Sequence, residues 1–122
     1  MLQEYFEQHA LWNRQPEKYQ IQTRADVVSM IPEDVTSILD AGCGDGFLTN
    51  NLPQDSFVVG TDLSWKALHF LSRNPTQASV DHLPFASQSF DLVMVNDTLE
   101  HIPPAISRRD AAFNLNKMLT HP

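Results

Sequence analysis

The chain of 122 residues has few of the features that mark secreted, membrane-spanning or nucleic-acid-binding proteins. Its single cysteine, Cys43, excludes an internal disulfide framework. Only 8 lysine and arginine residues stand against 15 aspartate and glutamate residues, and the net charge of −7 disfavours a nucleic-acid or anionic-membrane surface. No apolar run approaches the roughly 20 residues that span a bilayer, and the N-terminus lacks the segments of a signal peptide. We therefore expect a cytoplasmic protein with neither a nucleic-acid nor a membrane partner.

Glycine is also scarce, with 4 residues in the chain, and three of them, Gly42, Gly44 and Gly46, occupy alternate positions of one loop. A short apolar run leads into Asp40 and this loop, and a second apolar run leads into Asp62. The pattern predicts strand, glycine turn, helix, strand and carboxylate. Such an arrangement lets the backbone approach a small polar ligand closely and places a carboxylate where a ribose could bind.

Apolar periodicity and turn residues predict strands that alternate with helices along one domain. The expected strands are 36–40, 57–61, 78–80 and 90–95, and the expected helices are 2–14, 17–30, 46–52, 64–72 and one that begins at Pro103 or Pro104. This alternation indicates parallel strands joined by right-handed crossovers, the doubly wound α/β class. We divide the domain into N-terminal helices (1–35), a core (36–102) and a last helix (103–122).

Two of these helices carry more detailed expectations. The inner face of helix 17–30 should consist of Ile21, Ala25 and Val28, which recur at helical spacing. Ser64 is a suitable N-cap for helix 64–72, with Leu68 and Leu71 facing inward. Aromatic residues near the N-terminus either pack a flanking helix on the core or line a substrate pocket, and the sequence leaves both interpretations open.

Small or acidic polar residues end all four predicted strands. They are Asp40 with its glycines, Asp62, Asp81 and the pair Asn96-Asp97. In doubly wound sheets the ligand binds beyond the carboxyl ends of the strands, so these residues should meet at one edge. The sequence therefore predicts a ligand site there.

The glycine spacing narrows the choice of ligand. A dinucleotide-binding turn needs G-x-G-x-x-G, but Phe47 occupies the sixth position. The Gly-Lys-Ser/Thr ending of a phosphate-binding loop is absent, and Asp45 inside the loop disfavours a polyanion. We expect a cationic or zwitterionic ligand that carries a ribose.

Four motifs in order resemble the class I S-adenosylmethionine-dependent methyltransferases, over roughly residues 19–119. The likeness is greatest to the small-molecule group (methyltransferase type 11) that includes the ubiquinone and menaquinone biosynthesis methyltransferases. The motifs are Asp40-x-Gly42-x-Gly44-x-Gly46, Gly60–Ser64, Val80–Phe85, and Phe90–Val93 followed by Leu99–Ile102. The resemblance implies a Rossmann-like doubly wound parallel sheet with strand order 3-2-1-4, and S-adenosylmethionine as cofactor.

The resemblance also implies roles at the methionine end of the cofactor. The backbone of Gly42, Gly44 and Gly46 would pack against the methionine part. Asp40 would anchor the loop and the water network around the amino group. Asn96 would lie beside that amino group and line the methyl-transfer site.

At the nucleoside end, the resemblance assigns four further residues. Asp62 would accept hydrogen bonds from both ribose hydroxyls, and Leu63 would pack on the adenine face. Asp81 would accept a hydrogen bond from the exocyclic amine of adenine, and the backbone of His82 would contact the edge of the ring.

No catalytic residue follows from the sequence. An activated sulfonium needs mainly in-line positioning, and a base helps only if the acceptor has a proton to lose. Asp97, Glu100 and His101 are the candidates, although Glu100 and His101 also suit loop structure and helix capping. The five histidines have no metal-ligand spacing, so we expect no metal site. Cys43 is most simply a small space-filling residue.

The complete fold of this family has further strands after the fourth. We therefore expect the chain to be a C-terminally truncated methyltransferase whose strand 90–95 forms an open apolar edge, or one whose edge another chain covers, such as a second copy. Two functions stay open. One is methyl transfer to a small-molecule acceptor, and the other is a non-catalytic fragment or cofactor-binding module that packs against a partner.

Overall fold

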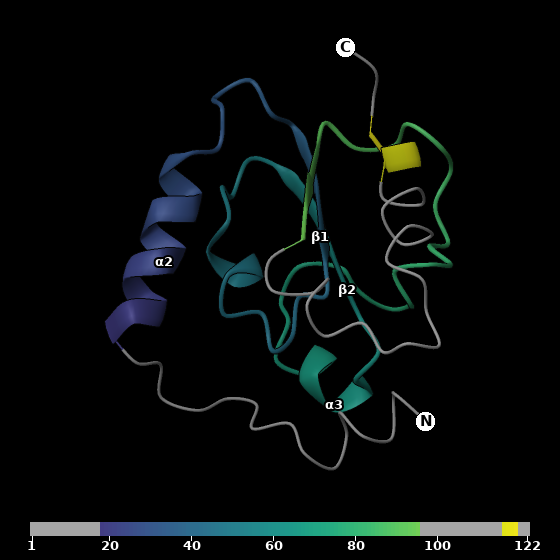
Figure 1. The fold of residues 1–122 in the computed structure, drawn as a ribbon, viewed down its shortest axis with the longest axis horizontal. Helices are drawn as coiled ribbons and strands as arrows, with labels where there is room; N and C mark the ends of the chain where they lie inside the picture. Colours follow the sequence, from purple (N-terminus) through teal and green to yellow (C-terminus); the bar gives the residue numbers. More distant parts are fainter. Residues whose placement is uncertain (1–17, 96–115, 120–122) are drawn as a thin grey trace.

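The computed structural model describes residues 18–95 and 116–119 (Figure 1). Its elements are α2 (Lys18–Ser29), β1 (Ser37–Ala41), the 3₁₀ helix η1 (Thr49–Asn51), β2 (Phe57–Asp62), α3 (Trp65–Leu68), β3 (Pro75–Gln77) and β4 (Leu92–Met94). The predicted helix 2–14 and most of the predicted last helix lie outside the described residues, so both stay predictions.

The described strands form one parallel sheet in the order β3-β2-β1-β4. In β1, Ile38 pairs with Val58 of β2 on one side and with Leu92 of β4 on the other. The edge strand β3 pairs only with the carboxyl end of β2, from Gly60 onward. The predicted parallel α/β sheet and its strand order are confirmed.

Side chains of the two central strands alternate between two apolar layers, as the pleat requires. On one face, Ile38 and Val58 pack with Leu48 and Leu52, which flank the described 3₁₀ helix, and with partly buried residues of α2. On the other face, Leu39 and Val59 pack with the buried side chains of Phe90 and Met118. Both faces of the sheet are therefore covered near its centre, as is usual for parallel sheets.

The third strand lies earlier than predicted, at Pro75–Gln77 and not at 78–80. Asn74 turns the chain with a φ of 43°, and its side-chain amide donates to the carbonyl of Val58 at 2.8 Å. Pro75 can begin this strand because β3 is at the edge of the described sheet, where a missing N–H is tolerated. Val80 is buried, but it packs against Ala41 from a loop.

The helices between the strands are shorter than expected. In place of helix 46–52 the structure has the 3₁₀ turn η1, because the side chain of Asn50 bonds to Phe70 and Ser72 and the chain becomes extended at Leu52. Helix 64–72 is reduced to α3, although Ser64 caps it as predicted by accepting from the N–H of Ala67 at 3.2 Å.

The inward-facing residues of the helices were only partly predicted. Leu68 and Leu71 are buried, as expected. On α2, however, Val27 and Val28 pack on the core, whereas Ile21 is 44% exposed. The prediction was therefore right for Val28 but wrong for Ile21 and for Ala25, which is also exposed, because this helix contacts the core near its C-terminal end.

Strand β4 is also shorter than the predicted 90–95. Phe90 instead forms an isolated parallel bridge with Leu119, and its N–H donates to the carbonyl of Met118 at 2.9 Å. The N–H of Gln88 donates to the carbonyl of Lys117 at 2.7 Å. The segment 117–119 therefore lies beside the chain that leads into β4.

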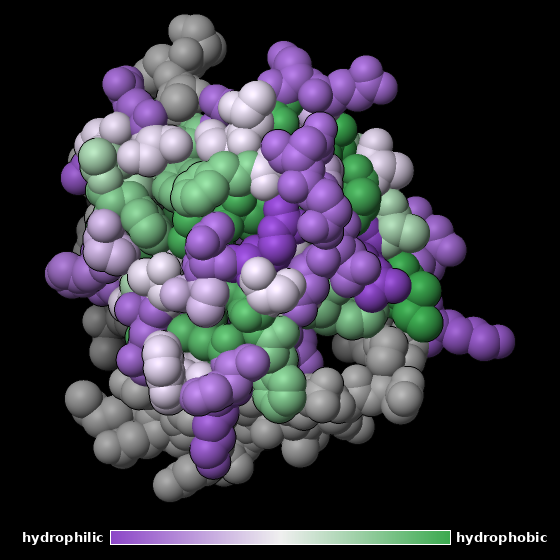
Figure 2. All heavy atoms as spheres, turned by 180° about the vertical axis from the view of Figure 1, so that it is seen from behind, coloured by the Kyte–Doolittle hydropathy of each residue, from purple (hydrophilic) through white to green (hydrophobic). Residues whose placement is uncertain are grey.

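Apolar residues at the surface are dispersed among polar ones. Within residues 18–95 and 116–119, the large apolar side chains that are exposed are Ile21, Met30, Phe57, Trp65 and Phe70. They belong to α2, β2, α3 and the chain that follows α2 and α3. Figure 2 shows apolar and polar groups interspersed on the rear face. Among the described residues, no helix is long and apolar enough to cross a bilayer.

Candidate functional site

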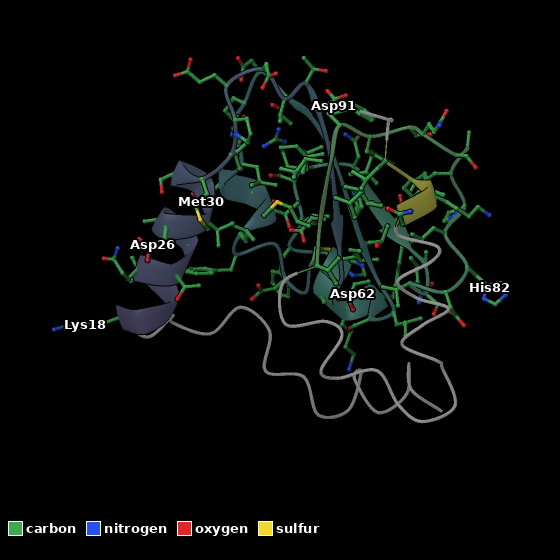
Figure 3. The ribbon with its side chains drawn as sticks, turned by 45° about the horizontal axis from the view of Figure 1, so that its top comes forward. Lys18, Asp26, Met30, Asp62, His82 and Asp91 are labelled. Carbon is green, nitrogen blue, oxygen red and sulfur yellow. The ribbon has the colours of Figure 1, made fainter. Side chains whose placement is uncertain are left out.

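The candidate site lies at the carboxyl ends of β1 and β2. Figure 3 shows Asp62 at this end of the sheet, beside α3, and Asp91 at the opposite end. Asp91 accepts from the N–H and the hydroxyl of Thr36 at 2.9 and 2.7 Å, and its own N–H donates to the carbonyl of Ser37. Asp91 therefore ties the chain before β4 to the start of β1, away from the site.

The glycine loop adopts a conformation that favours glycine at alternate positions. Gly42, Gly44 and Gly46 have φ angles of 77°, 59° and 85°, in the left-handed region that side chains disfavour. The N–H groups of Gly42 and Cys43 both donate to the carbonyl of Thr61, at 2.7 and 2.8 Å. These bonds fix the loop against the end of β2.

Space as well as backbone conformation restricts the loop. A Cβ atom on Gly46 would lie 2.6 Å from Cδ1 of Leu71 and 2.8 Å from Nδ2 of Asn50. A Cβ on Gly60 of β2 would lie 2.6 Å from Cδ2 of Leu71 and 3.0 Å from Sγ of Cys43. The loop, β2 and the chain after α3 are thus in close contact.

Asp62 connects the glycine loop to the start of α3. Its Oδ2 accepts from the N–H of Gly44 and its Oδ1 accepts from the N–H of Ser64, both at 2.9 Å. Each oxygen of an ionised carboxylate can accept two hydrogen bonds. The side chain is half-buried.

Asp40 lies beneath the loop, where it is 2% exposed. Its Oδ2 accepts from the hydroxyl of Thr49 at 2.6 Å, so the carboxyl group joins β1 to η1. The pKa of Asp40 is raised to about 6, mainly by burial; the hydrogen bond from Thr49 opposes this rise, and the negative charge of Asp62 adds to it. The expected anchor of the loop is therefore a buried carboxyl group that titrates near neutrality.

The thiol of Cys43 is directed into the protein, with Sγ 3.7 Å from the carbonyl oxygen of Gly44. Burial raises the pKa of this thiol, and the charges of Asp40 and Asp62 raise it further. A thiol with a raised pKa stays protonated at neutral pH and is a poor nucleophile. This agrees with the interpretation of Cys43 as a space-filling residue.

Asp81 lies in the loop after β3, and its Oδ1 has two side-chain neighbours. The hydroxyl of Ser79 donates to Oδ1, and Nδ1 of His82 lies 3.3 Å from it. The hydrogen bond from Ser79 is the main cause that lowers the pKa of Asp81, partial burial raises it, and His82 lowers it further.

Leu63 and His82 occupy different surroundings. Leu63 is half-buried, and its carbonyl accepts from Nε2 of Gln77 at 2.9 Å. The side chain of His82 is 86% exposed and points away from Asp62 in Figure 3. Its N–H donates to the carbonyl of Ser79 at 3.1 Å, and the expected contact of the His82 backbone with the edge of adenine stays a prediction.

The remaining predicted residues, Asn96, Asp97, Glu100 and His101, lie outside the described residues. Sequence reasoning missed three polar side chains that hold the site together: Thr49, Gln77 and Ser79. No sequence pattern indicated Thr49 or Gln77, because their hydrogen-bond partners are distant in the sequence. Ser79 had a weak signal, since it stands two residues before a predicted ligand-binding aspartate.

The described part of the site consists of glycine backbone and carboxylates. Among the described residues, no group of three or more histidine, cysteine, aspartate or glutamate side chains could hold a metal ion. Carboxylates of this kind can accept hydrogen bonds from hydroxyls and amines and attract a cation. The backbone of a glycine loop can approach such a ligand closely.

Comparisons of sequence agree with this geometry. The profile of a family described as "Methyltransferase domain" matches residues 39–119. The ubiquinone biosynthesis O-methyltransferase of Albidiferax ferrireducens is 33% identical over 92 residues, which cover 66% of this chain and 36% of that protein. The matched part spans about a third of the length of the curated relatives.

Solved structures share the fold. The PH0226 protein of Pyrococcus horikoshii OT3 has a TM-score of 0.73 at 20% identity, covering 96% of this chain and 61% of that chain. Magnesium protoporphyrin IX methyltransferase (ChlM) of Synechocystis PCC 6803, solved with bound S-adenosylmethionine, has a TM-score of 0.71 at 21% identity, covering 97% of this chain and 70% of that chain. The family profile runs from the middle of β1 to the segment beside the chain that leads into β4, over more than half of the sequence. The chain therefore belongs to the class I S-adenosylmethionine-dependent methyltransferases, whose cofactor is S-adenosylmethionine.

Proposed function

We propose that this chain supplies the S-adenosylmethionine-binding part of a methyltransferase that acts on a small-molecule acceptor. The observation that carries the proposal is the half-buried carboxylate of Asp62, held by the N–H groups of Gly44 and Ser64 at the end of β2. Family membership supports the cofactor. The relative that acts in ubiquinone biosynthesis supports a small-molecule acceptor.

In this proposal Asp62 binds the ribose. Its two oxygens are each fixed by a backbone N–H, so the carboxylate needs no reorganisation to accept from two adjacent hydroxyls. Leu63 follows directly and provides an apolar surface for the adenine face. The side-chain amide of Gln77 donates to the carbonyl of Leu63 and holds this residue in place.

The glycine loop receives the methionine part of the cofactor. Gly42, Gly44 and Gly46 have no side chains that would keep the ligand away from the backbone. Asp40 acts from below by holding Thr49, and so fixes the chain that leaves the loop. Asn96 follows the fourth strand in sequence, and we assign it to the neighbourhood of the methionine amino group.

In this proposal the loop after β3 recognises adenine. Asp81 accepts from the exocyclic amine, and the backbone of His82 contacts the ring edge. An aspartate is ionised at neutral pH even at its ordinary pKa, and the lowered pKa of Asp81 favours the ionised form further. An ionised carboxylate suits a group that has to accept from an amine.

When bound, the cofactor supplies a methyl group on a positively charged sulfur, already activated for transfer. The chain's own residues bind and orient the cofactor and the acceptor and exclude water from them, because correct positioning accounts for much of the rate. Asp97, Glu100 and His101 are the candidates for removing a proton from an acceptor that carries one.

Calorimetric titration of the chain with S-adenosylmethionine and with S-adenosylhomocysteine tests the proposal. We expect dissociation constants within about 1 μM to 1 mM, the usual range of substrate affinities. Asp62→Asn removes the charge and replaces one acceptor oxygen by a donor, so binding of either ligand should weaken about tenfold or more, as expected for hydrogen bonds to a charged group.

Asp26→Asn is the matched control, since Asp26 is an exposed residue of α2 that lies away from Asp62 (Figure 3). Its affinity should equal that of the unaltered chain. Thermal unfolding of each variant without ligand separates loss of binding from loss of the fold. Equal affinity of the Asp62→Asn variant and the unaltered chain would contradict the ribose assignment.

A further inference from the structure

The loop that follows β3 fixes Asp81 through its neighbours in sequence. Val80 is buried and packs against Ala41, with partly buried Leu83 beside them. Ser79 and Asp81 flank Val80 and are only partly buried. Their side chains meet, because the hydroxyl of Ser79 donates to Oδ1 of Asp81.

Both side-chain contacts of Asp81 involve the same oxygen. Ser79 donates to Oδ1, and the ring of His82 lies 3.3 Å from Oδ1. Neither contact uses Oδ2. The carboxylate therefore has one oxygen bound within the loop and a second oxygen whose direction is set by the first.

Of the two neighbours, Ser79 is the better placed to orient the carboxylate. The side chain of His82 is 86% exposed, and a contact made by so exposed a side chain contributes little. Ser79 is part of the same turn as Asp81, since its carbonyl accepts from the N–H of His82 at 3.1 Å. Its hydroxyl is also the main cause of the lowered pKa of Asp81.

We propose that Ser79 is a positioning residue that directs Oδ2 of Asp81 toward the exocyclic amine of adenine, and so makes the site specific for adenine over hypoxanthine. This inference rests on the proposed function. Adenine presents an N–H donor at its C6 substituent, whereas a base with a carbonyl there presents an acceptor. A fixed carboxylate oxygen binds the donor and repels the acceptor, and a carboxylate free to rotate discriminates less.

S-adenosylhomocysteine and its deaminated counterpart S-inosylhomocysteine, which differ at C6 and in the protonation of N1, provide the probe. S-adenosylhomocysteine carries the amine, and S-inosylhomocysteine carries a carbonyl in its place. We expect the chain to bind the adenosyl compound roughly tenfold or more tightly, the effect of one hydrogen bond to a charged group. In the Ser79→Ala variant that ratio should fall to within about threefold, mainly through weaker binding of the adenosyl compound.

Two further variants separate orientation from general damage to the loop. Ser79→Thr keeps the hydroxyl and should retain the preference for adenine. Ser89→Ala removes a hydroxyl that donates to the carbonyl of Ala86 in a later part of the same connection, and should leave both affinities unchanged. Circular dichroism and thermal unfolding of all variants check that each is folded.

The outcomes distinguish this inference from the function on which it rests. If the unaltered chain binds neither compound, the proposed cofactor site is wrong and the inference fails with it. If the chain binds both equally, the adenine role of Asp81 is wrong although the ribose role of Asp62 stands. If Ser79→Ala keeps the full preference for adenine, Ser79 does not orient the carboxylate.

Discussion

Asp40 is the carboxyl group with the least exposure among those of the described residues. Sequence analysis predicted that it anchors the loop, but it gave no indication of the partner. The hydroxyl of Thr49 donates to it across the glycine turn, and this pairing depends on how the turn closes. The spacing of the glycines predicted the loop, whereas the contacts that hold the loop come from folding of β2 and η1 around it.

The raised pKa of Asp40 predicts a dependence of stability on pH. Its pKa is about 6 in the folded chain and 3.8 in the reference state, so the folded chain binds this proton more tightly. Between those values the unfolded chain has lost the proton and the folded chain still holds it, and stability falls as pH rises. The loss over this window should be about 2 to 3 kcal/mol, with no further loss above about pH 7.

Urea unfolding from pH 4 to pH 8 measures this effect, with Asp40→Asn as the comparison. Asparagine keeps an oxygen that can accept from Thr49 but carries no charge. The variant should have a flatter profile between pH 4 and pH 6 and should exceed the unaltered chain in stability at pH 7. Parallel profiles for the two proteins would show that Asp40 does not titrate in this window.

At the scale of elements, apolar runs located the central strands and failed at the edge strand. β1 and β2 are buried and rich in aliphatic residues, so their signal is strong. β3 consists of Pro75, Thr76 and Gln77, and only its pairing with β2 makes it a strand. Val80 gave the misleading signal, because its burial comes from packing on Ala41 and not from strand pairing.

Arg73 joins two connections that are separated in the sequence. Its guanidinium donates to the carbonyl oxygens of Leu52, Pro53 and Ser56 at 2.9 to 3.0 Å. One planar group thus holds the chain between η1 and β2 against the chain before β3. A lysine at this position carries a single ammonium group, which does not reproduce the planar fork.

Arg73→Lys should therefore lower the free energy of unfolding by roughly 1 to 3 kcal/mol, as expected when hydrogen bonds from a charged donor are lost. Arg24→Lys is the matched control. Arg24 lies over the ring of Phe47, with Cζ 4.3 Å from the centroid, and a lysine can make the same kind of contact. Chemical denaturation of both variants gives the comparison, and equal stability losses would show that the guanidinium fork has no special role.

At the scale of the whole molecule, the net charge of −7 and the carboxylates at the site favour a positively charged ligand. S-adenosylmethionine carries one more positive charge than S-adenosylhomocysteine, because its sulfur is a sulfonium. An acidic field attracts the first and is nearly indifferent to the second. The chain should therefore bind the two compounds with different dependence on ionic strength.

Raising the salt concentration shortens the screening length from about 10 Å at 0.1 M to about 3 Å at 1 M. The affinity for S-adenosylmethionine should then fall by roughly fivefold, the equivalent of about 1 kcal/mol between charges near water. The affinity for S-adenosylhomocysteine, measured in the same titrations, should change by less than about twofold. Equal salt dependence for both compounds would mean that shape and hydrogen bonds, and not the charge of the chain, determine the choice between cofactor and product.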